Sequence, residues 1–478
     1  MKRRDFLRTA AVLGAASMIG TRPDDADAKR LPGGSILDRP AAAAPIDTIV
    51  VCMMENRSFD HYMGWLATDE TYLETGRSLW GKRFRVDGST TQTYARANGT
   101  RVATYPMLSE LAQPWRGCGF RDPGHGWNAG RAQRDGGFLA TGSGNDEFAL
   151  GWYRESDLPF YGALTRRFTT FDRYHCSVLG PTYPNREYLH SAQSGGLKNN
   201  AFPFEVGYPN GFPWATIWDR LAAAGVPARY YYVDLPFVAL FGPRLAPIAS
   251  PIANYFEDAA AGRLPRVVFL DPGFLGEFQS DEHPHGDVRD GQRLVQQFVK
   301  AFVESPHWRS GAFILTYDEW GGFFDHVAPP RLRDDRANRR DDQNDFSQAG
   351  FRVPTRLISP FARRNFVDHR VYDHTSILRF IEWRFLGTRA DGVGSRRDPV
   401  YLTERDRHAK NIAQTLSPTA PDFDFDTGPV DPGSSPGCGS EAAATLAARA
   451  ALPPSDFERG VDWVASQGYR IGNWLPGR

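Results

Sequence analysis

In the segment IDTIVVCMMENRSFDHYMGWL (residues 46–66), an apolar run passes into Glu55 and Asn56 without an intervening turn residue. A strand that only fills a core normally ends in Gly, Pro or a hairpin turn. In LTYDEWGGFFDHV, a second apolar run likewise ends in Asp318 and Glu319. Two buried strands that end in oxygen ligands indicate a site for a cation.

The residue types at these strand ends favour a divalent cation. Glu55, Asp318 and Glu319 would repel one another in a cleft unless a cation neutralised them. Carboxylate and amide oxygens suit Ca²⁺, Mg²⁺ or Mn²⁺, and a borderline metal such as Zn²⁺ is the alternative. The spacing alone fits separate, solvated loop carboxylates equally well.

A hydroxyl is predicted at the start of a helix in GPTYPNREYLHSAQ. Pro184 suits the first turn of this helix, with Thr182 or Tyr183 at its N-terminal cap. A hydroxyl there faces backbone N–H groups and the positive end of the helix dipole, which favours phosphate binding and the alkoxide form. A plain capping role for Thr182 is the alternative interpretation.

Several histidines stand in polar loops bounded by Gly or Pro, in DPGHGWNAG, DEHPHGD and the end of LTYDEWGGFFDHV. Such residues are candidates for contacting phosphate or for giving a proton to a leaving group. They are His125, His283, His285 and His326. A structural or merely exposed role is the alternative for each of them.

Short β-branched runs alternate with helical patterns along the chain. This alternation predicts an α/β fold with a central, mostly parallel sheet flanked by helices on both faces. In such folds the site lies outside the carboxyl ends of the strands, where Glu55 and Asn56 would stand. The predicted strands are 48–54, 228–233, 266–270, 312–317 and 353–359, and the predicted helices are 213–224, 290–304 and 375–385.

Two segments depart from this alternation. Residues 76–106 alternate polar and apolar side chains around Gly-containing turns and predict a small capping excursion of strands or loops. Residues 331–349 are charged and poor in apolar side chains, so we expect an exposed loop there.

The N-terminus predicts a cleaved export signal over residues 1–28. A basic start with Arg3 and Arg4 precedes a short apolar run, and A-x-A spacing follows, as in twin-arginine (Tat) signals. We expect a catalytic domain over 45–420 and a C-terminal extension over 421–478 that packs on it. The 56 basic and 56 acidic side chains argue against nucleic acid as a partner.

Five segments, in order, resemble a known family: ENRSFDHYMG, DPGHGWNAG, YHCSVLGPTYPNR, DEHPHGD and TYDEWGGFFDHV. They are similar to the bacterial phosphoesterase family of phospholipases C and related acid phosphatases, within the alkaline phosphatase superfamily. The resemblance covers most of the chain, from about residue 45 to about residue 420, and it implies an alkaline-phosphatase-like sheet.

The resemblance also implies roles for the matching residues. Glu55 and Asn56 would ligate one divalent metal, and Asp318 and Glu319 would close its site. Thr182, coordinated to this metal, would attack phosphorus and form a phosphothreonine that water hydrolyses.

Other matching residues would act around the metal. His125, His283 and His326 would bind phosphate oxygens or protonate the leaving alkoxide. The residues that would hold the ligands in place are Arg57, Asp60, Asn185 and Asp325, and Asp325 would fix the tautomer of the His326 ring.

Aromatic side chains in these segments are candidates for substrate contact. Trp320 stands where the resemblance leads us to expect a histidine. Trp127, Tyr153 and Trp320 would suit a choline headgroup, since cations bind well on aromatic faces. Packing of loops against the core is the alternative role.

The combined expectation is an exported, metal-dependent phosphoesterase of the phospholipase C type, acting on phosphodiesters such as phosphatidylcholine. An acid phosphatase acting on monoesters is one alternative, and a non-catalytic envelope binding protein is another. No G-x-S-x-G elbow stands between a predicted strand and a predicted helix, which disfavours a serine hydrolase.

The same expectation names partners and a location. The partners would be a phospholipid or small phosphoester, a transiently contacted membrane surface and the Tat translocase. The final location would be the periplasm, the cell surface or the medium.

Overall fold

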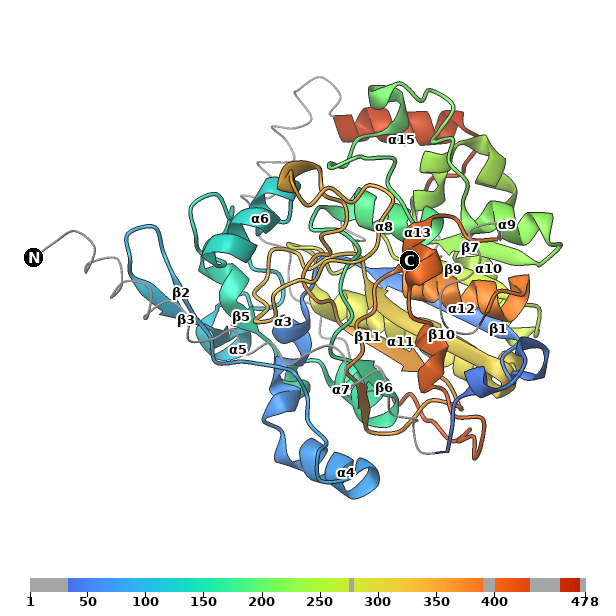
Figure 1. Cartoon of the computed structure of the whole chain (residues 1–478), viewed down its shortest axis with the longest axis horizontal. Helices are drawn as coiled ribbons and strands as arrows, with labels where there is room; N and C mark the ends of the chain where they lie inside the picture. The colour runs from blue at the N-terminus through green and yellow to red at the C-terminus, as the bar shows by residue number, and fades with distance from the viewer. Residues whose placement is uncertain (1–32, 275–278, 390–399, 430–455, 473–478) are drawn as a thin grey trace, which may run out of the picture. The chain divides into compact units, whose positions relative to one another are not determined.

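The computed structural model describes residues 33–274, 279–389, 400–429 and 456–472, with the backbone alone at 456–458. Its centre is an eight-stranded sheet in the order β12-β6-β11-β10-β1-β9-β7-β8 (Figure 1). β11 runs antiparallel to both neighbours, and the other neighbouring pairs are parallel. The strands are β1 Thr48–Met54, β6 Thr169–Phe171, β7 Ala228–Tyr232, β8 Ala249–Pro251, β9 Val267–Asp271, β10 Gly311–Tyr317, β11 Thr355–Ile358 and β12 Phe366–Asp368. The predicted mostly parallel sheet is confirmed.

Helices flank this sheet in two groups (Figure 1). Helices α8, α9 and α12 contact one another, and α11 contacts both α7 and α10. The helices are α3 Phe59–Met63, α4 Glu70–Trp80, α5 Met107–Glu110, α6 Trp127–Gly136, α7 Pro159–Arg167, α8 Thr182–Ser191, α9 Ile217–Ala223, α10 Ala253–Ala260, α11 Val288–Glu304, α12 Thr375–Leu386, α13 Glu404–His408 and α15 Asp456–Ser466. The predicted α/β class is therefore confirmed.

The two central strands explain why the sheet forms. Every residue of β1 and β10 is buried, as is typical of parallel strands that are covered on both faces.

One predicted helix starts later than expected: α9 begins at Ile217, not at Pro213. Thr216 caps it, because its hydroxyl accepts from Asp219 N at 3.2 Å while the Asp219 carboxylate accepts from Thr216 N at 2.8 Å.

The predicted excursion at 76–106 contains a small antiparallel pair, β2 Thr93–Ala95 and β3 Arg101–Ala103. A second small pair joins β4 Tyr105–Pro106 to β5 Gly151–Trp152 in parallel. These short strands stand outside the eight-stranded sheet.

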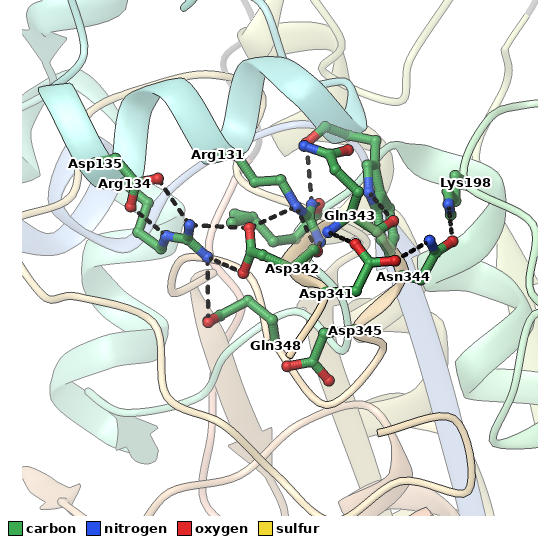
Figure 2. A network of polar contacts seen from close by, with 12 residues as sticks. Arg131, Arg134, Asp135, Lys198, Asp341, Asp342, Gln343, Asn344, Asp345 and Gln348 are labelled. Atoms are coloured by element: carbon green, nitrogen blue, oxygen red, sulfur yellow. Dashed lines mark hydrogen bonds and ion pairs between the residues drawn. The ribbon is translucent and has the colours of Figure 1, made fainter. Parts of the chain in front are cut away.

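The segment 331–349 is exposed in its first part only, because residues 345–349 are buried. Figure 2 shows the reason: arginines of α6 reach into this segment. Arg134 donates to both Asp342 carboxylate oxygens, at 3.0 and 3.1 Å, and Arg131 lies 3.1 Å from the same carboxylate. Charge composition predicted a solvated loop, whereas opposite charges on α6 hold much of it against the protein.

Near the C-terminus, described residues contact the rest of the chain. Trp308 Nε1 donates to the Phe423 carbonyl at 2.9 Å. The Tyr469 hydroxyl donates to the Gly242 carbonyl at 2.9 Å. The predicted export signal at 1–28 lies outside the described residues. Within the described ranges, no helix combines the length and apolarity that crossing a membrane requires.

Candidate active site

The carboxyl ends of β1 and β10 meet at one edge of the sheet. Met54 pairs with Tyr317 in parallel register, so the next residues, Glu55 and Asp318, leave the sheet side by side. Asn56 N–H donates to Asp318 Oδ1 at 3.0 Å, which ties the two turns together. Asn56 has a φ of 60°, a left-handed conformation that asparagine tolerates better than most residues. The two strand ends therefore meet as the sequence predicted.

Three oxygens of this group are buried without a hydrogen-bond partner. We call Glu55, Asn56, Asp318 and Glu319 the strand-end flank. The oxygens are Asn56 Oδ1, Asp318 Oδ2 and Glu319 Oε1. Each buried polar atom without a partner costs about 1–3 kcal/mol, and a divalent cation would satisfy all three. Carboxylate and amide oxygens are also the ligands that a hard cation takes, so the residues present fit the expected metal.

The pKa values of the carboxyl groups in the strand-end flank also favour a bound cation. Burial, followed by the charge of Glu55, raises the pKa of Asp318 to about 7. Burial and the charge of Asp318 raise the pKa of Glu319 well above its usual range. Burial also raises the pKa of Glu55. The side chains around these carboxyl groups thus supply too little positive charge to keep all three ionised.

Arg186 brings a buried positive charge to this flank, and sequence reasoning missed it. Its Nε donates to Glu55 Oε1 at 3.0 Å and lies 3.8 Å from Asp318 Oδ2. Its Nη1 donates to Asp271 Oδ1 at 2.9 Å, at the end of β9. The available signal was spacing: Arg186 follows Thr182 by four residues, and such positions share one face of a helix.

Thr182 is the first residue of α8, and Pro181, rather than Thr182 or Tyr183, is the N-cap. Asn185 shapes the turn that leads into the helix. Its Nδ2 donates to the Gly180 and Pro181 carbonyls, at 2.8 and 3.2 Å. Asn185 therefore holds the loop that presents Thr182.

Asp122, His125 and His283, which we call the loop flank, converge beside the strand-end flank. One carboxylate oxygen and one nitrogen from each ring lie within 4.8 Å of one another. His125 Nδ1 donates to the Pro123 carbonyl at 2.7 Å, and its Nε2 lies 3.5 Å from Asn56 Nδ2. Burial lowers the pKa of His125. A neutral ring bonded in this way carries its proton on Nδ1 and a lone pair on Nε2.

The Gly321–Gly322 pair joins the two flanks. Its φ angles are 64° and 71°, in the left-handed region that glycine adopts at no steric cost. A Cβ at Gly321 would stand 2.1 Å from the Asn56 carbonyl oxygen, and one at Gly322 would stand 2.7 Å from the Gly124 carbonyl oxygen. Asn145 adds a bridge, because it donates to Gly322 O at 2.9 Å and accepts from Gly124 N at 2.8 Å.

His326, an expected catalytic residue, has both ring nitrogens engaged elsewhere. Its Nδ1 bonds Asp60 Oδ2 at 2.5 Å and its Nε2 bonds Asp87 Oδ1 at 3.3 Å. Asp325 instead accepts from Arg352 at 3.0 and 3.1 Å, so Asp60, and not Asp325, orients the ring. Burial alone would lower the pKa of His326, but the two carboxylate bonds outweigh it and raise the pKa to about 10.

Arg57 supports the segment that carries His283. Its Nε donates to the Glu282 carbonyl at 2.9 Å. The Glu282 carboxylate is itself held by the hydroxyls of Tyr62 and Tyr317, at 2.7 and 2.8 Å. The Arg57 side chain thereby positions a neighbour of the loop flank, while its backbone N–H donates to the Glu319 carbonyl of the strand-end flank at 3.1 Å.

A cavity of about 790 Å³ is lined by residues of both flanks, Glu55 and His283, together with Thr182. Asp281, which sequence reasoning did not select, adds a carboxylate to its wall. The apolar part of the wall includes Tyr183, Phe202, Leu235, Phe237 and Phe274. The cavity wall thus combines polar and aromatic side chains.

The aromatic residues expected to contact the substrate do not line this cavity. Trp320 is fully buried and donates from Nε1 to Gln133 Oε1 at 2.7 Å. The Tyr153 hydroxyl donates to the Pro114 carbonyl at 2.5 Å, and Trp127 packs in a separate small apolar cluster. These rings fix loops against the core, whereas the cavity takes Tyr183 from the start of α8 and its other rings from segments that the sequence analysis did not select.

The family model and the sequence relatives agree on one family. The sequence model of the Phosphoesterase family matches residues 46–386. Non-specific phospholipase C6 of Arabidopsis thaliana is 30% identical over 409 residues, which cover 78% of this chain and 72% of that protein. Phospholipase C B of Mycobacterium tuberculosis is 29% identical over 484 residues, covering 89% and 88%. A solved alkaline phosphatase superfamily protein from Vibrio parahaemolyticus matches at a TM-score of 0.31 and 12% identity, covering 51% and 62%.

Proposed function

The chain belongs to the phosphoesterase family, and from this premise we propose that it is a metal-dependent phosphodiesterase of the phospholipase C type. The observation that carries the proposal is the set of three unpartnered buried oxygens in the strand-end flank, next to the cavity that Thr182 lines. Relatives at this level of identity are named phospholipases C, which supports a diester substrate such as phosphatidylcholine.

The strand-end flank and Thr182 would together hold one divalent cation. Bound there, the cation would supply Lewis-acid chemistry, lowering the pKa of a coordinated hydroxyl and neutralising negative charge on phosphate. Glu55, Asn56, Asp318 and Glu319 would provide its protein oxygens. Arg186 would hold the Glu55 carboxylate in place through the hydrogen bond between them.

In the reaction, Thr182 Oγ loses its proton and forms a bond to phosphorus. The bond between phosphorus and the diacylglycerol oxygen breaks, and that oxygen takes up a proton. Water then cleaves the phosphothreonine, which releases the phosphorylated headgroup and restores the hydroxyl. His125 and His283 would face the phosphate oxygens and the leaving alkoxide, while His326, with both nitrogens engaged, is assigned to positioning Asp60.

The chemistry of the cavity favours diesters over monoesters. A monoester dianion rewards several cationic side chains, but the arginine in this wall, Arg186, is already bonded to Glu55 and Asp271. Glu205 adds a carboxylate to the same wall, and Asp281 adds a carboxyl group whose pKa is raised by burial and the charge of Glu55. An aromatic wall with nearby carboxylates suits a cationic headgroup such as choline. The acid phosphatase alternative therefore ranks second, and a non-catalytic binding protein would need none of these groups.

We also propose that the protein is exported. The twin-arginine start predicts passage through the Tat translocase and a location in the periplasm, on the cell surface or in the medium. A lipid substrate would bring the enzyme into transient contact with a membrane surface.

The test compares hydrolysis of p-nitrophenylphosphorylcholine with that of p-nitrophenyl phosphate, with and without chelator. We expect a diester preference that chelator and Thr182→Ala both abolish. Thr216→Ala, which removes a threonine from another helix start, is the matched control and should retain turnover. An active Thr182→Ala variant would overturn the nucleophile, and a monoester preference would make the enzyme an acid phosphatase.

A further inference from the structure

We propose that two neighbouring surfaces beside the cavity dock the enzyme on a lipid bilayer that carries anionic headgroups. The first, which we call the arginine loop, is residues 331–345. The inference deepens the proposed function, on which its role in catalysis rests, by naming the surface that would meet a phospholipid substrate. Bilayer binding itself can be measured without turnover. The second surface, the aromatic rim, consists of Phe204, Val206, Tyr208, Trp214 and Trp463.

The arginine loop has five arginines and five aspartates, yet the fold separates the two kinds of charge. Three of the aspartates are each paired with an arginine, which neutralises them within the protein. Figure 2 shows one of these pairs, between Asp342 and Arg134 of α6. The pairs are Asp342 with Arg131 and Arg134, Asp334 with Arg405, and Asp345 with Arg331.

Positive charge is left on the outer surface of this loop. Four of its arginines are exposed, and their guanidinium groups pair with no carboxylate among the described residues. The two remaining acids, Asp335 and Asp341, accept the backbone N–H groups of Glu404 at 2.9 Å and Gln343 at 3.2 Å. The loop thus sets four unpaired cations against two anions, an excess that attracts an anionic surface. The four are Arg333, Arg336, Arg339 and Arg340.

This positive charge reaches the edge of the substrate cavity. Lys198 Nζ donates to Asn344 Oδ1 of the arginine loop at 2.5 Å (Figure 2). Lys198 lines a second cavity, of about 850 Å³, together with Asn199 and Asn200. Asn199 and Asn200 also line the cavity to which Thr182 contributes, so the two cavities share a wall.

The aromatic rim borders the substrate cavity as well. Within the described residues, four large apolar side chains are exposed, and two of them are Val206 and Tyr208, at 37% and 38%. Val206 also lines the cavity. The Tyr208 ring lies edge to face with that of Trp214, and Phe204 packs against Trp463, with centroid distances of 5.8 and 5.9 Å. Tyrosine and tryptophan favour the boundary between water and lipid, because each has an apolar body and a polar tip.

Gly195 and Gly196 join the aromatic rim to the arginine loop. Their φ angles are 62° and 93°, in the region that glycine adopts at no steric cost. A Cβ at Gly195 would stand 2.4 Å from the Trp214 ring, and one at Gly196 would stand 3.2 Å from Arg336 Nη1. The aromatic and the cationic surface therefore meet at one turn.

The combination of these surfaces selects a bilayer as the partner. Apolar side chains that enter the bilayer boundary and basic side chains that attract anionic headgroups together hold proteins on membranes. An acidic protein would also attract the arginines, but it gives no reason for exposed apolar side chains beside a cavity proposed to take a lipid. Glu205, the one carboxylate within residues 204–209, accepts from Phe202 N at 2.7 Å and lines that cavity, where a cationic headgroup would offset its charge.

The experiment measures co-sedimentation of the full chain with vesicles of phosphatidylcholine alone and of phosphatidylcholine with about one third phosphatidylglycerol. Chelator is present so that the lipid is not consumed. We expect wild type to bind the anionic vesicles more tightly, by a difference that about 0.5 M salt removes. Arg339→Gln combined with Arg340→Gln should weaken binding to the anionic vesicles by about 10- to 30-fold. Tyr208→Ser should weaken binding to both kinds of vesicle.

Arg229→Gln combined with Arg364→Gln is the matched control. Both arginines are exposed and pair with no described carboxylate. They lie at the opposite edge of the sheet, at the start of β7 and just before β12. This variant loses the same charge and should bind anionic vesicles as wild type does. None of the altered residues lines the substrate cavity, so every variant should retain turnover of soluble p-nitrophenylphosphorylcholine.

Two results would overturn the inference. One is equal binding of wild type to both kinds of vesicle, and the other is unchanged binding when Arg339 and Arg340 are both replaced. Binding of polyglutamate in place of vesicles would identify an acidic protein as the partner and would overturn it as well. Turnover of the soluble diester without vesicle binding contradicts this inference alone, whereas vesicle binding without any turnover contradicts the proposed function alone.

Discussion

The two flanks of the cavity are built on different supports. The strand-end flank continues directly from β1 and β10, and Asn56, Asp318 and Glu319 are fully buried. The residues of the loop flank lie on turns, and the Asp122 side chain is 40% exposed. Rigid strand ends fix oxygen ligands in place, whereas loops allow small adjustments around the substrate. We therefore expect substitutions in the strand-end flank to have the larger effects.

The largest difference between the two flanks is expected when one carboxylate on each flank is changed to an amide. Glu319→Gln should lower turnover of the phosphodiester roughly 10³-fold, because the proposed cation would lose an anionic ligand. Asp122→Asn should lower it by about 10- to 100-fold. Steady-state kinetics at saturating Ca²⁺ measures both. Equal losses would show that the flanks contribute alike.

The next contrast concerns stability. Arg186→Met would leave Glu55 and Asp271 buried without their partner, so we expect a loss of about 3–5 kcal/mol in the free energy of unfolding. His283→Ala, on the loop flank, should change that free energy by about 0.5 kcal/mol or less. Urea unfolding of the metal-free proteins compares the two. A small effect of Arg186→Met would mean that the carboxyl groups are already protonated.

A third prediction separates stability from metal binding within the strand-end flank. Asp318→Asn removes charge from the crowded carboxyl groups, so the metal-free variant should gain about 1 kcal/mol in stability at pH 8. The same variant should lose most of the stabilisation that Ca²⁺ gives to wild type. Thermal unfolding with and without Ca²⁺ tests both statements, and a metal-free variant less stable than wild type would contradict the first.

The last prediction concerns the ion network outside both flanks, which serves as the reference. Because the pKa of His326 is raised to about 10 in the folded protein, its contribution is complete below about pH 6.5, the unfolded pKa. It is lost as pH rises toward 10. His326→Gln should therefore destabilise the protein at pH 6 and match wild type more closely at pH 10. A difference that grows with pH would contradict this assignment.

The contrast between the flanks also explains what the sequence could predict. Continuous apolar runs located β1 and β10, and the polar residues that follow them located the strand-end flank. The sequence analysis missed Arg186 because an arginine within a helical pattern normally lies on the solvent-exposed face of the helix. Only the fold shows that this side chain is buried. His125 and His283 were selected one by one, but nothing in their spacing predicts that two loops so far apart in the chain converge.

The Gly321–Gly322 pair sets the spacing between the two flanks. Gly321 rests on Asn56 and Gly322 rests on the Asp122–His125 turn, so a single dipeptide sets how far apart the two flanks stand. A Cβ at either glycine would collide with a backbone carbonyl oxygen, so the two flanks can stand this close only while both positions lack a side chain.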